Sequence, residues 1–263
     1  MTDWLGLCRE AVVDVRGVLG DLPTRNEREP VVGDGVGGDE TTAIDAAAER
    51  VILERLRAVD GATIVSEEVG ELRGEGRWRV VVDPIDGSLN AKRGIPFFSL
   101  SIAVAEGESM DDVVFGYVYD FGTAEEWTAE RGAGARLNGY ELDDVRPKEK
   151  IEILSFEATL TSSVAEKAAA MVGVAHRLRI MGSLALSLCH LAAGRVDAVC
   201  SLKAARAVDI AAAQLLVRER GLAIDLPEAP PFGAAPLDVE GRSRVVAAAT
   251  PEVCAKLFAA LSA

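Results

Sequence analysis

Apolar positions in the first half of the chain predict two amphipathic helices followed by a run of strands. Residues 3–19 carry apolar side chains at the spacing of one helical face, and Asp3 or the residue before it can cap this helix. The apolar positions between Ile44 and Leu56 predict a second helix. Between residues 60 and 140 the pattern changes to short β-branched and aromatic runs separated by turn residues, which is typical of strands.

The expected strands of this part are 62–65, 80–83, 98–105, 113–119 and 125–129. Residues 71–76 are expected to return the chain as a hairpin between the first two of them.

After residue 150 the pattern becomes an alternation of strands and helices. The expected strands are 151–156, 177–181, 196–201, 222–225 and 243–248, and the expected helices are 163–172, 184–193, 207–220 and 251–262. This change indicates two halves, an α+β half over residues 1–147 and an α/β half over residues 148–263. A chain of 263 residues is long enough for both.

The composition is that of a globular protein with an acidic surface. Apolar residues make up 49% of the chain and charged residues 27%, which is enough to bury a core, and the net charge is −14. This charge argues against nucleic acid as a general partner, because phosphate contacts need concentrated positive charge. The sequence contains no apolar run of membrane-spanning length and no recognisable targeting segment, so we expect a cytoplasmic protein without a membrane partner.

Neither the cysteines nor the histidines form a metal-binding or catalytic pattern. The four cysteines are scattered without a Cys-x-x-Cys pair, so a disulfide framework or a zinc site is not expected. Cys189 and Cys200 lie in apolar surroundings, which is typical of core residues. His176 and His190 have no second ligand at metal spacing, so we assign them packing or surface roles.

The chemistry concentrates at the end of the strand that begins at Val80. The run from Val80 to Val82 is continuous and β-branched, which predicts a buried strand, and Pro84 is expected to end it at Asp83. Asp83 and Asp86 then lie close together around a turn, and clustered carboxylates are the oxygen ligands that Mg²⁺ prefers. On these residues alone, an ordinary Asp-Pro turn followed by glycine is the alternative interpretation.

Three further segments with acidic residues precede this strand. Glu67 and Glu68 follow the expected strand 62–65, so they can converge on the same site. Thr42 and Asp45 have the spacing of a capping box at the start of the second helix. The glycine-rich residues 30–41 are either a flexible linker or a mobile loop whose carboxylates complete the coordination of a cation.

The string Asp83-Pro-Ile-Asp86-Gly-Ser, preceded by a β run and by Ser66-Glu67-Glu68, closely resembles the signature of the inositol monophosphatase superfamily of Mg²⁺-dependent sugar phosphatases. The resemblance implies the layered αβαβα sandwich of those enzymes. In that fold the first half is α+β, the second half is α/β, and the active site lies between them.

Two later segments also resemble family patterns, in the family order. Gly182-Ser183-Leu-Ala resembles a segment that contacts the sugar, and Arg206-Ala-Val-Asp209-Ile-Ala-Ala resembles one that supplies a metal ligand. Val208 stands where many relatives have tryptophan, and the Arg-x-x-Asp form is similar to archaeal members. Some of those members hydrolyse both fructose-1,6-bisphosphate and inositol monophosphate.

The resemblance implies two or three Mg²⁺ ions per site, for which Mn²⁺ can substitute. The implied ligand sets are Glu67, Asp83 and the carbonyl of Ile85 for the first ion, Asp83, Asp86 and Asp209 for the second, and Glu67 with Asp45, helped by Asp39, for the third. Glu67, Asp45, Asp39 and Ser88 are the implied catalytic residues, and the hydroxyl of Ser88 would orient the attacking water.

The resemblance also implies the substrate contacts. Phosphate would lie beside Asp86 and bind the amides of Gly87 and Ser88. The residues expected to face the sugar are Arg179, Gly182, Ser183, Lys203 and Arg206.

The implied function is hydrolysis of the phosphomonoester of a small sugar or inositol phosphate by a metal-activated water, in a homodimer as in many relatives. Two alternatives stay open from the sequence. One is a phosphatase acting on 3′-phosphoadenosine 5′-phosphate or an inositol polyphosphate. The other is a non-catalytic regulatory homologue that keeps the fold and the metal site.

Overall fold

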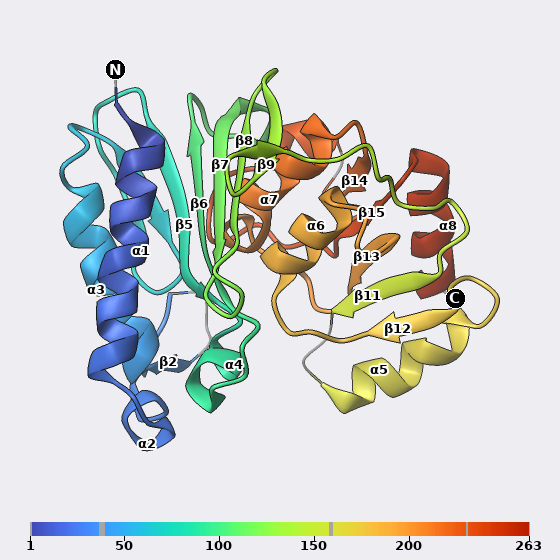
Figure 1. The fold of residues 1–263 in the computed structure, drawn as a ribbon, viewed down its shortest axis with the longest axis horizontal. Coiled ribbons are helices and arrows are strands. Elements are labelled where there is room, and N and C mark those ends of the chain that lie inside the picture. Colours follow the sequence, from blue (N-terminus) through green and yellow to red (C-terminus); the bar gives the residue numbers. More distant parts are fainter. Residues whose placement is uncertain (1, 37–39, 158–159, 230, 263) are drawn as a thin grey trace.

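The computed structural model of the chain describes residues 2–36, 40–157, 160–229 and 231–262. Its helices are α1 (Trp4–Asp21), α2 (Arg25–Arg28), α3 (Ala43–Leu56), α4 (Ser88–Arg93), α5 (Thr161–Ala168), α6 (Leu184–Ala192), α7 (Ala207–Glu219) and α8 (Pro251–Ser262), with short 3₁₀ helices at Met110–Asp112, Ala169–Met171 and Phe232–Ala234. Two sheets separate three helical layers, formed by α1 with α3, by α6 with α7, and by α5 with α8 (Figure 1). The αβαβα sandwich implied by the resemblance is confirmed.

The first sheet has eight strands in the order β10-β9-β8-β7-β6-β5-β3-β4. Their bounds are β3 Thr63–Ser66, β4 Gly70–Leu72, β5 Arg79–Asp86, β6 Ser99–Ala105, β7 Val113–Asp120, β8 Glu126–Glu130, β9 Gly134–Leu137 and β10 Tyr140–Glu141. β3 and β5 pair in parallel, and the other neighbours pair antiparallel. A separate two-stranded ladder joins β1 (Val31–Asp34) to β2 (Glu40–Thr42).

The second sheet has five strands in the order β12-β11-β13-β15-β14. Their bounds are β11 Ile153–Glu157, β12 Arg177–Arg179, β13 Ala198–Ser201, β14 Ala223–Asp225 and β15 Val246–Ala248. β11 pairs in parallel with β12 and β13, whereas β15 pairs antiparallel with β13 and β14. The alternation of strands and helices expected after residue 150 is therefore present. Residues 1–147 are called the first half and residues 148–263 the second half; that they form separate domains stays a prediction.

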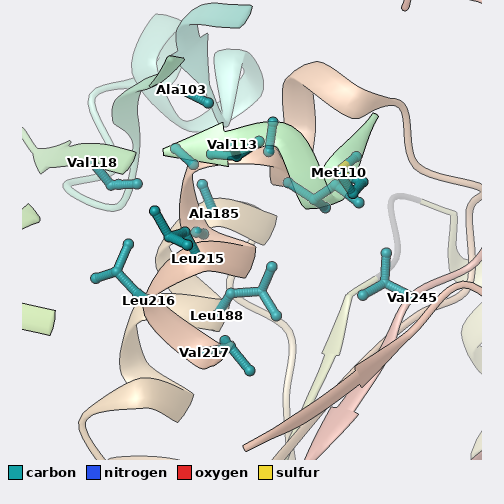
Figure 2. Close-up of a cluster of buried hydrophobic side chains, with 14 of the residues drawn as sticks. Ala103, Met110, Val113, Val118, Ala185, Leu188, Leu215, Leu216, Val217 and Val245 are labelled. Carbon is teal, nitrogen blue, oxygen red and sulfur yellow. The ribbon is translucent and has the colours of Figure 1, made fainter. Parts of the chain in front are cut away.

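Strand β5 is buried on both faces, which explains its continuous apolar run. Val80 and Val82 belong to the apolar cluster beneath α1 and α3, and Val81 belongs to the cluster around α6 and α7. Since successive side chains of a strand point to opposite faces, β5 contributes to both cores. Figure 2 shows part of the second cluster, to which both Leu188 of α6 and Leu216 of α7 belong.

Two local expectations are wrong. β5 does not end at Asp83 but continues to Asp86, with a break in its register between these residues. Pro84 lacks an amide hydrogen and lies within this break, so the ladder is interrupted there and resumes where Asp86 pairs with Ser99. Residues 71–76 do not form a hairpin onto β5, because β4 is the antiparallel partner of β3 at the edge of the sheet.

The cysteines behave as the sequence predicts. All four are free thiols in buried positions, including Cys189 and Cys200. None of the helices in the described part of the chain is both long and apolar enough to cross a membrane.

A buried aspartate fixes the segment that joins the two halves. Oδ1 of Asp197 accepts a hydrogen bond from the amide of Lys148 at 2.9 Å. Its Oδ2 accepts hydrogen bonds from the amides of Glu152 at 2.9 Å and Ile153 at 3.0 Å. One carboxylate therefore satisfies three backbone donors where the chain enters β11.

We expect Asp197→Ala to lower the free energy of unfolding by about 2–3 kcal/mol, because it leaves partly buried amides without an acceptor. Urea denaturation followed by circular dichroism measures the change. The matched control is Asp238→Ala, which removes an acceptor for the amides of Glu240 and Gly241 on a more exposed turn, where water replaces it. Equal losses in both variants would contradict this role of Asp197.

Candidate active site

A cavity of about 490 Å³ lies between the two halves and receives side chains from both. The carboxylates that line it are Glu40, Asp45, Glu67, Glu68, Asp83, Asp86, Glu157 and Asp209, and the cations are Lys92, Lys203, Arg206 and Arg242. Every described carboxylate that the resemblance implies as a metal ligand is in this set. Asp39 lies outside the described residues, so its implied role stays a prediction.

The end of β5 presents two of these aspartates around the register break. Oδ1 of Asp83 accepts a hydrogen bond from the amide of Ile85 at 3.0 Å, which fixes the carboxylate beside its own strand. The chain then turns at Gly87, whose φ of 91° is a left-handed conformation that favours glycine. Ser88 begins α4, and its hydroxyl donates to the carbonyl of Ile85 at 2.9 Å. Gly87 and Ser88 both line the cavity.

Asp86 connects the two halves of the molecule. Its Oδ2 accepts hydrogen bonds from the hydroxyl of Ser183, from the amide of Ala185 at 3.0 Å, and from the hydroxyl of Ser99 at 3.3 Å. Ser183 also caps α6 by accepting from the amide of Leu186 at 3.2 Å. The side chain of Ser183 is therefore buried against Asp86 and lies outside the lining of the cavity, whereas the resemblance implied that it faces the sugar.

A close backbone contact accompanies this connection. A Cβ on Gly87 would lie 3.0 Å from the carbonyl oxygen of Gly182, and a Cβ on Gly182 would lie 2.9 Å from Nδ2 of Asn90. Gly182 also has a left-handed φ, of 88°. Nδ2 of Asn90 donates to the carbonyls of Phe97 and Met181, each at 2.8 Å. The turn before α6 thus packs closely against the first half, through the hydrogen bonds of Asn90 and the approach of Gly87 to Gly182. Glycine at both positions permits this approach.

Arg206 lies against the carboxylates, which the sequence did not predict. Its guanidinium donates to Oε1 of Glu67 and, at 3.3 Å, to Oδ1 of Asp209. The amide of Arg206 donates to Oδ2 of Asp209 at 2.7 Å, in the capping arrangement that begins α7. Arg206 was expected to face the sugar, and the structure instead directs its guanidinium to two implied metal ligands.

The start of α3 holds the remaining implied ligand. Oδ2 of Asp45 accepts hydrogen bonds from the amide and hydroxyl of Thr42, so the predicted capping box is present. Oδ1 of Asp45 is buried and has no hydrogen-bond partner among the described residues. Glu68 accepts a hydrogen bond from the hydroxyl of Thr41, which belongs to β2. The described ends of the glycine-rich segment therefore lie beside the cavity, which favours an active-site loop over a linker.

Burial and mutual repulsion raise the pKa values of these carboxylates, so their charged forms are disfavoured. Burial raises the pKa of Glu67 to about 7, against the opposing effect of Arg206. Burial likewise raises the pKa of Asp86 to about 7. For Asp83, burial and then the charges of Glu67 and Asp86 raise the pKa well above its usual value. Such a cluster favours either protons or cations.

The donor set fits a hard divalent cation. Within residues 2–36, 40–157, 160–229 and 231–262, no three Asp, Glu, His or Cys side chains lie in an arrangement that would hold a metal ion as they stand. Glu67 and Asp209 instead contact Arg206. The chemistry nevertheless suits Mg²⁺, because the donors are carboxylate oxygens and Oδ1 of Asp45 is buried without a partner among the described residues.

The expected sugar contacts divide into two groups. Gly182 and Lys203 line the cavity, together with Arg206. Arg179 lies outside that lining; it is exposed on β12, and its guanidinium donates to the carbonyl of Leu178 at 2.9 Å. The implied sugar contact of Arg179 has no support from its position in this chain.

Glu157 is a cavity residue that sequence reasoning missed. Its carboxylate accepts hydrogen bonds from the hydroxyls of Ser155 at 2.8 Å and Ser187 at 2.7 Å, and from the amide of Gly182 at 2.9 Å. Its position in the sequence held a signal, because it ends a strand of the second sheet and ligand-binding residues collect at the carboxyl ends of parallel strands. Lys92 and Arg242, which also line the cavity, carried no comparable signal.

The two histidines do not line the cavity. His190 is packed edge-on against Phe97, with ring centroids 5.6 Å apart, and burial lowers its pKa. His176 is exposed beside Arg177. These positions agree with the packing and surface roles assigned from the sequence.

Comparison with known proteins identifies the family. The model of the inositol monophosphatase family matches residues 7–263. The chain belongs to the inositol monophosphatase family. It is a phosphatase, as the signature at Asp83 implied.

Several relatives are similar to this family member over most of its length. The fructose-1,6-bisphosphatase/inositol-1-monophosphatase of Archaeoglobus fulgidus is 34% identical over 249 residues, which cover 94% of this chain and 93% of the relative. The protein of the same name from Thermococcus kodakarensis is 37% identical over 191 residues, covering 72% and 71%. The Nus factor SuhB of Escherichia coli is 36% identical over 194 residues, covering 70% of each chain.

Solved structures of the family have the same fold. An inositol monophosphatase-fructose 1,6 bisphosphatase superposes with a TM-score of 0.85 at 29% identity, covering 98% of this chain and all of the other. The extragenic suppressor protein suhB of Bartonella henselae superposes with a TM-score of 0.81 at 26% identity, covering 99% and 98%.

We expect the free energy of unfolding, measured in EDTA, to rise as the pH falls from 8 to 6. The folded pKa of Glu67 and of Asp86 is about 7, whereas the unfolded values are about 4.3 and about 3.9. The folded state therefore takes up protons in this window and the unfolded state does not, so falling pH stabilises the fold. Urea denaturation at three pH values measures the trend.

The control for this trend is Glu67→Gln, which removes one of the two titrating carboxylates. Its stability should rise less steeply over the same pH range than that of the wild type. Parallel slopes for the two proteins would show that Glu67 does not titrate in this window.

Proposed function

We propose that this chain is a Mg²⁺-dependent phosphomonoester hydrolase that acts on fructose-1,6-bisphosphate, inositol-1-phosphate or both. The observation that carries the proposal is the convergence of buried carboxylates from both halves on one cavity, next to the turn that begins α4. A phosphate monoester dianion repels nucleophiles, so its hydrolysis needs cations at the site. The names of the archaeal relatives support the choice of substrates.

The residues that would hold the metal ions are Glu67, Asp83, Asp86, Asp209, Asp45 and the carbonyl of Ile85. Bound Mg²⁺, or Mn²⁺ in its place, would neutralise the phosphate, lower the pKa of a water molecule and stabilise the leaving oxygen. The number of ions, two or three, belongs to the proposal, as does the contribution of Asp39.

The other residues would position the substrate and the water. The hydroxyl of Ser88 donates to the carbonyl of Ile85, so its oxygen is left to accept a hydrogen bond from the attacking water and orient it. The amides of Gly87 and Ser88 would bind the phosphate, since both residues line the cavity beside Asp83 and Asp86. Lys203 and Gly182 would contact the part of the substrate that extends toward the second half.

A homodimer and a cytoplasmic location are also part of the proposal. The homodimer rests on the resemblance of this chain to its family, whereas the location is the expectation drawn from the sequence itself. Multi-angle light scattering of the purified protein distinguishes a dimer from a monomer directly.

The first experiment is phosphate release from three substrates with Mg²⁺ and with EDTA. The panel is fructose-1,6-bisphosphate, inositol-1-phosphate and 3′-phosphoadenosine 5′-phosphate. We expect turnover of at least one of the first two, dependent on Mg²⁺, because the carboxylates that line the cavity outnumber its basic side chains and repel a phosphate dianion. A preference for the nucleotide would replace the proposed substrates. Absence of turnover on all three would favour the regulatory alternative, for which the similarity to the Nus factor SuhB provides a precedent.

We expect Asp86→Asn to raise the activation free energy, measured through kcat/KM, by more than about 4 kcal/mol, because it removes a charged ligand shared by the substrate and metal sites. The control is Asp112→Asn, which alters an aspartate with similar partners, the amide and hydroxyl of Ser109, away from the cavity. Thermal melting of both variants shows whether the fold is kept. Near-wild-type turnover by folded Asp86→Asn would exclude Asp86 from the site.

A further inference from the structure

The guanidinium of Arg206 and the metal ions of the proposed site need the same oxygen atoms. Arg206 contacts Oε1 of Glu67 and Oδ1 of Asp209 with a single nitrogen, Nη2. Glu67 and Asp209 belong to different metal-ligand sets in the proposed function, on which this inference rests. A guanidinium between two such carboxylates therefore competes with a divalent cation for them.

Arg206 is fixed in this position by its own helix. It is buried, with 8% of its surface exposed, and its backbone is the N-cap of α7. The amide of Arg206 donates to Oδ2 of Asp209, so the arginine and this ligand form one local unit. The backbone on its other side is held as well, because Ala205 exchanges amide-to-carbonyl hydrogen bonds with Ser243 at 2.7 and 3.2 Å. The backbone of Arg206 is therefore fixed beside Asp209, and the guanidinium reaches Glu67 and Asp209 from this fixed position.

The charges explain what such a cation contributes. Glu67, Asp83, Asp86 and Asp209 line the cavity close enough for the other three to act on Asp83, and Arg206 contacts two of the four. Its positive charge reduces their mutual repulsion without cancelling it. Lys92 also lines the cavity but comes from α4, and Lys203 is exposed on the loop before Arg206.

We propose that Arg206 is a built-in counterion that lowers the affinity of the site for Mg²⁺ and stabilises the carboxylate cluster independently of metal. Removing this charge leaves the same ligands with a more negative field, so divalent cations bind more tightly. The same removal leaves the buried carboxylates without their internal partner, so the fold becomes more dependent on bound metal.

The test is calorimetric titration of the full-length protein with Mg²⁺, and with Mn²⁺ as a second probe, without substrate. We expect Arg206→Met to lower the Kd by about tenfold, since a unit charge in contact with two ligands is removed. Arg206→Lys, which keeps the charge, should stay within about threefold of the wild type on the same basis. Lys92→Gln removes a cavity charge that is not in contact with these ligands, and should also stay within about threefold.

Thermal melting gives a second readout that does not depend on catalysis. In EDTA, the melting temperature of Arg206→Met should be lower than that of the wild type. Saturating Mg²⁺ should remove most of this difference in melting temperature. If Arg206→Met does not fold, Arg206→Gln is used in its place, because glutamine also removes the charge and keeps an amide donor. If the wild type binds Mg²⁺ and Arg206→Met binds it with the same or lower affinity, this inference is wrong and the proposed function is unaffected. Failure of the wild type to bind either cation would overturn the proposed function and this inference with it.

Discussion

The repulsion among buried carboxylates is the constraint that organises this molecule. Glu67, Asp83 and Asp86 come from the first half and Asp209 from the second, and burial raises the pKa of the first three. Such a cluster costs free energy unless its charges are compensated. The structure supplies compensating contacts, from Ile85 to Asp83, from Ala185 to Asp86 and from Arg206 to Glu67 and Asp209.

Those contacts follow one pattern. One oxygen of each aspartate is held by donors at the end of a strand or the start of a helix, as with Ile85 for Asp83 and Thr42 for Asp45. Asp86 uses the first turn of α6 in the same way, through the amide of Ala185. Backbone donors at helix N-termini are well suited to this task, because they carry partial positive charge without a mobile side chain. These three aspartates are thus oriented by backbone donors, whereas Glu67 is contacted by the side chain of Arg206.

Much of this arrangement could be predicted from sequence, and the failures have physical reasons. The strands, helices and acidic segments follow from periodicity and capping residues, which are local signals. The register break at Pro84 depends on the neighbouring strand, so the sequence alone suggested an end of the strand rather than a bulge. The roles of Arg206 and Ser183 depend on which of several neighbours each side chain meets across the interface, and no local pattern encodes that choice. Glu157 was missed because its partners, Ser187 and Gly182, are distant in sequence.

The glycine pair at the interface has a consequence for how such proteins evolve. Gly87 and Gly182 come from different halves, and a side chain on either would collide with the backbone or with Asn90 of its neighbour. A larger residue at either position therefore requires the facing segment to shift. The two positions constrain each other across the interface, so a segment exchanged at one of them has to remain compatible with the glycine at the other.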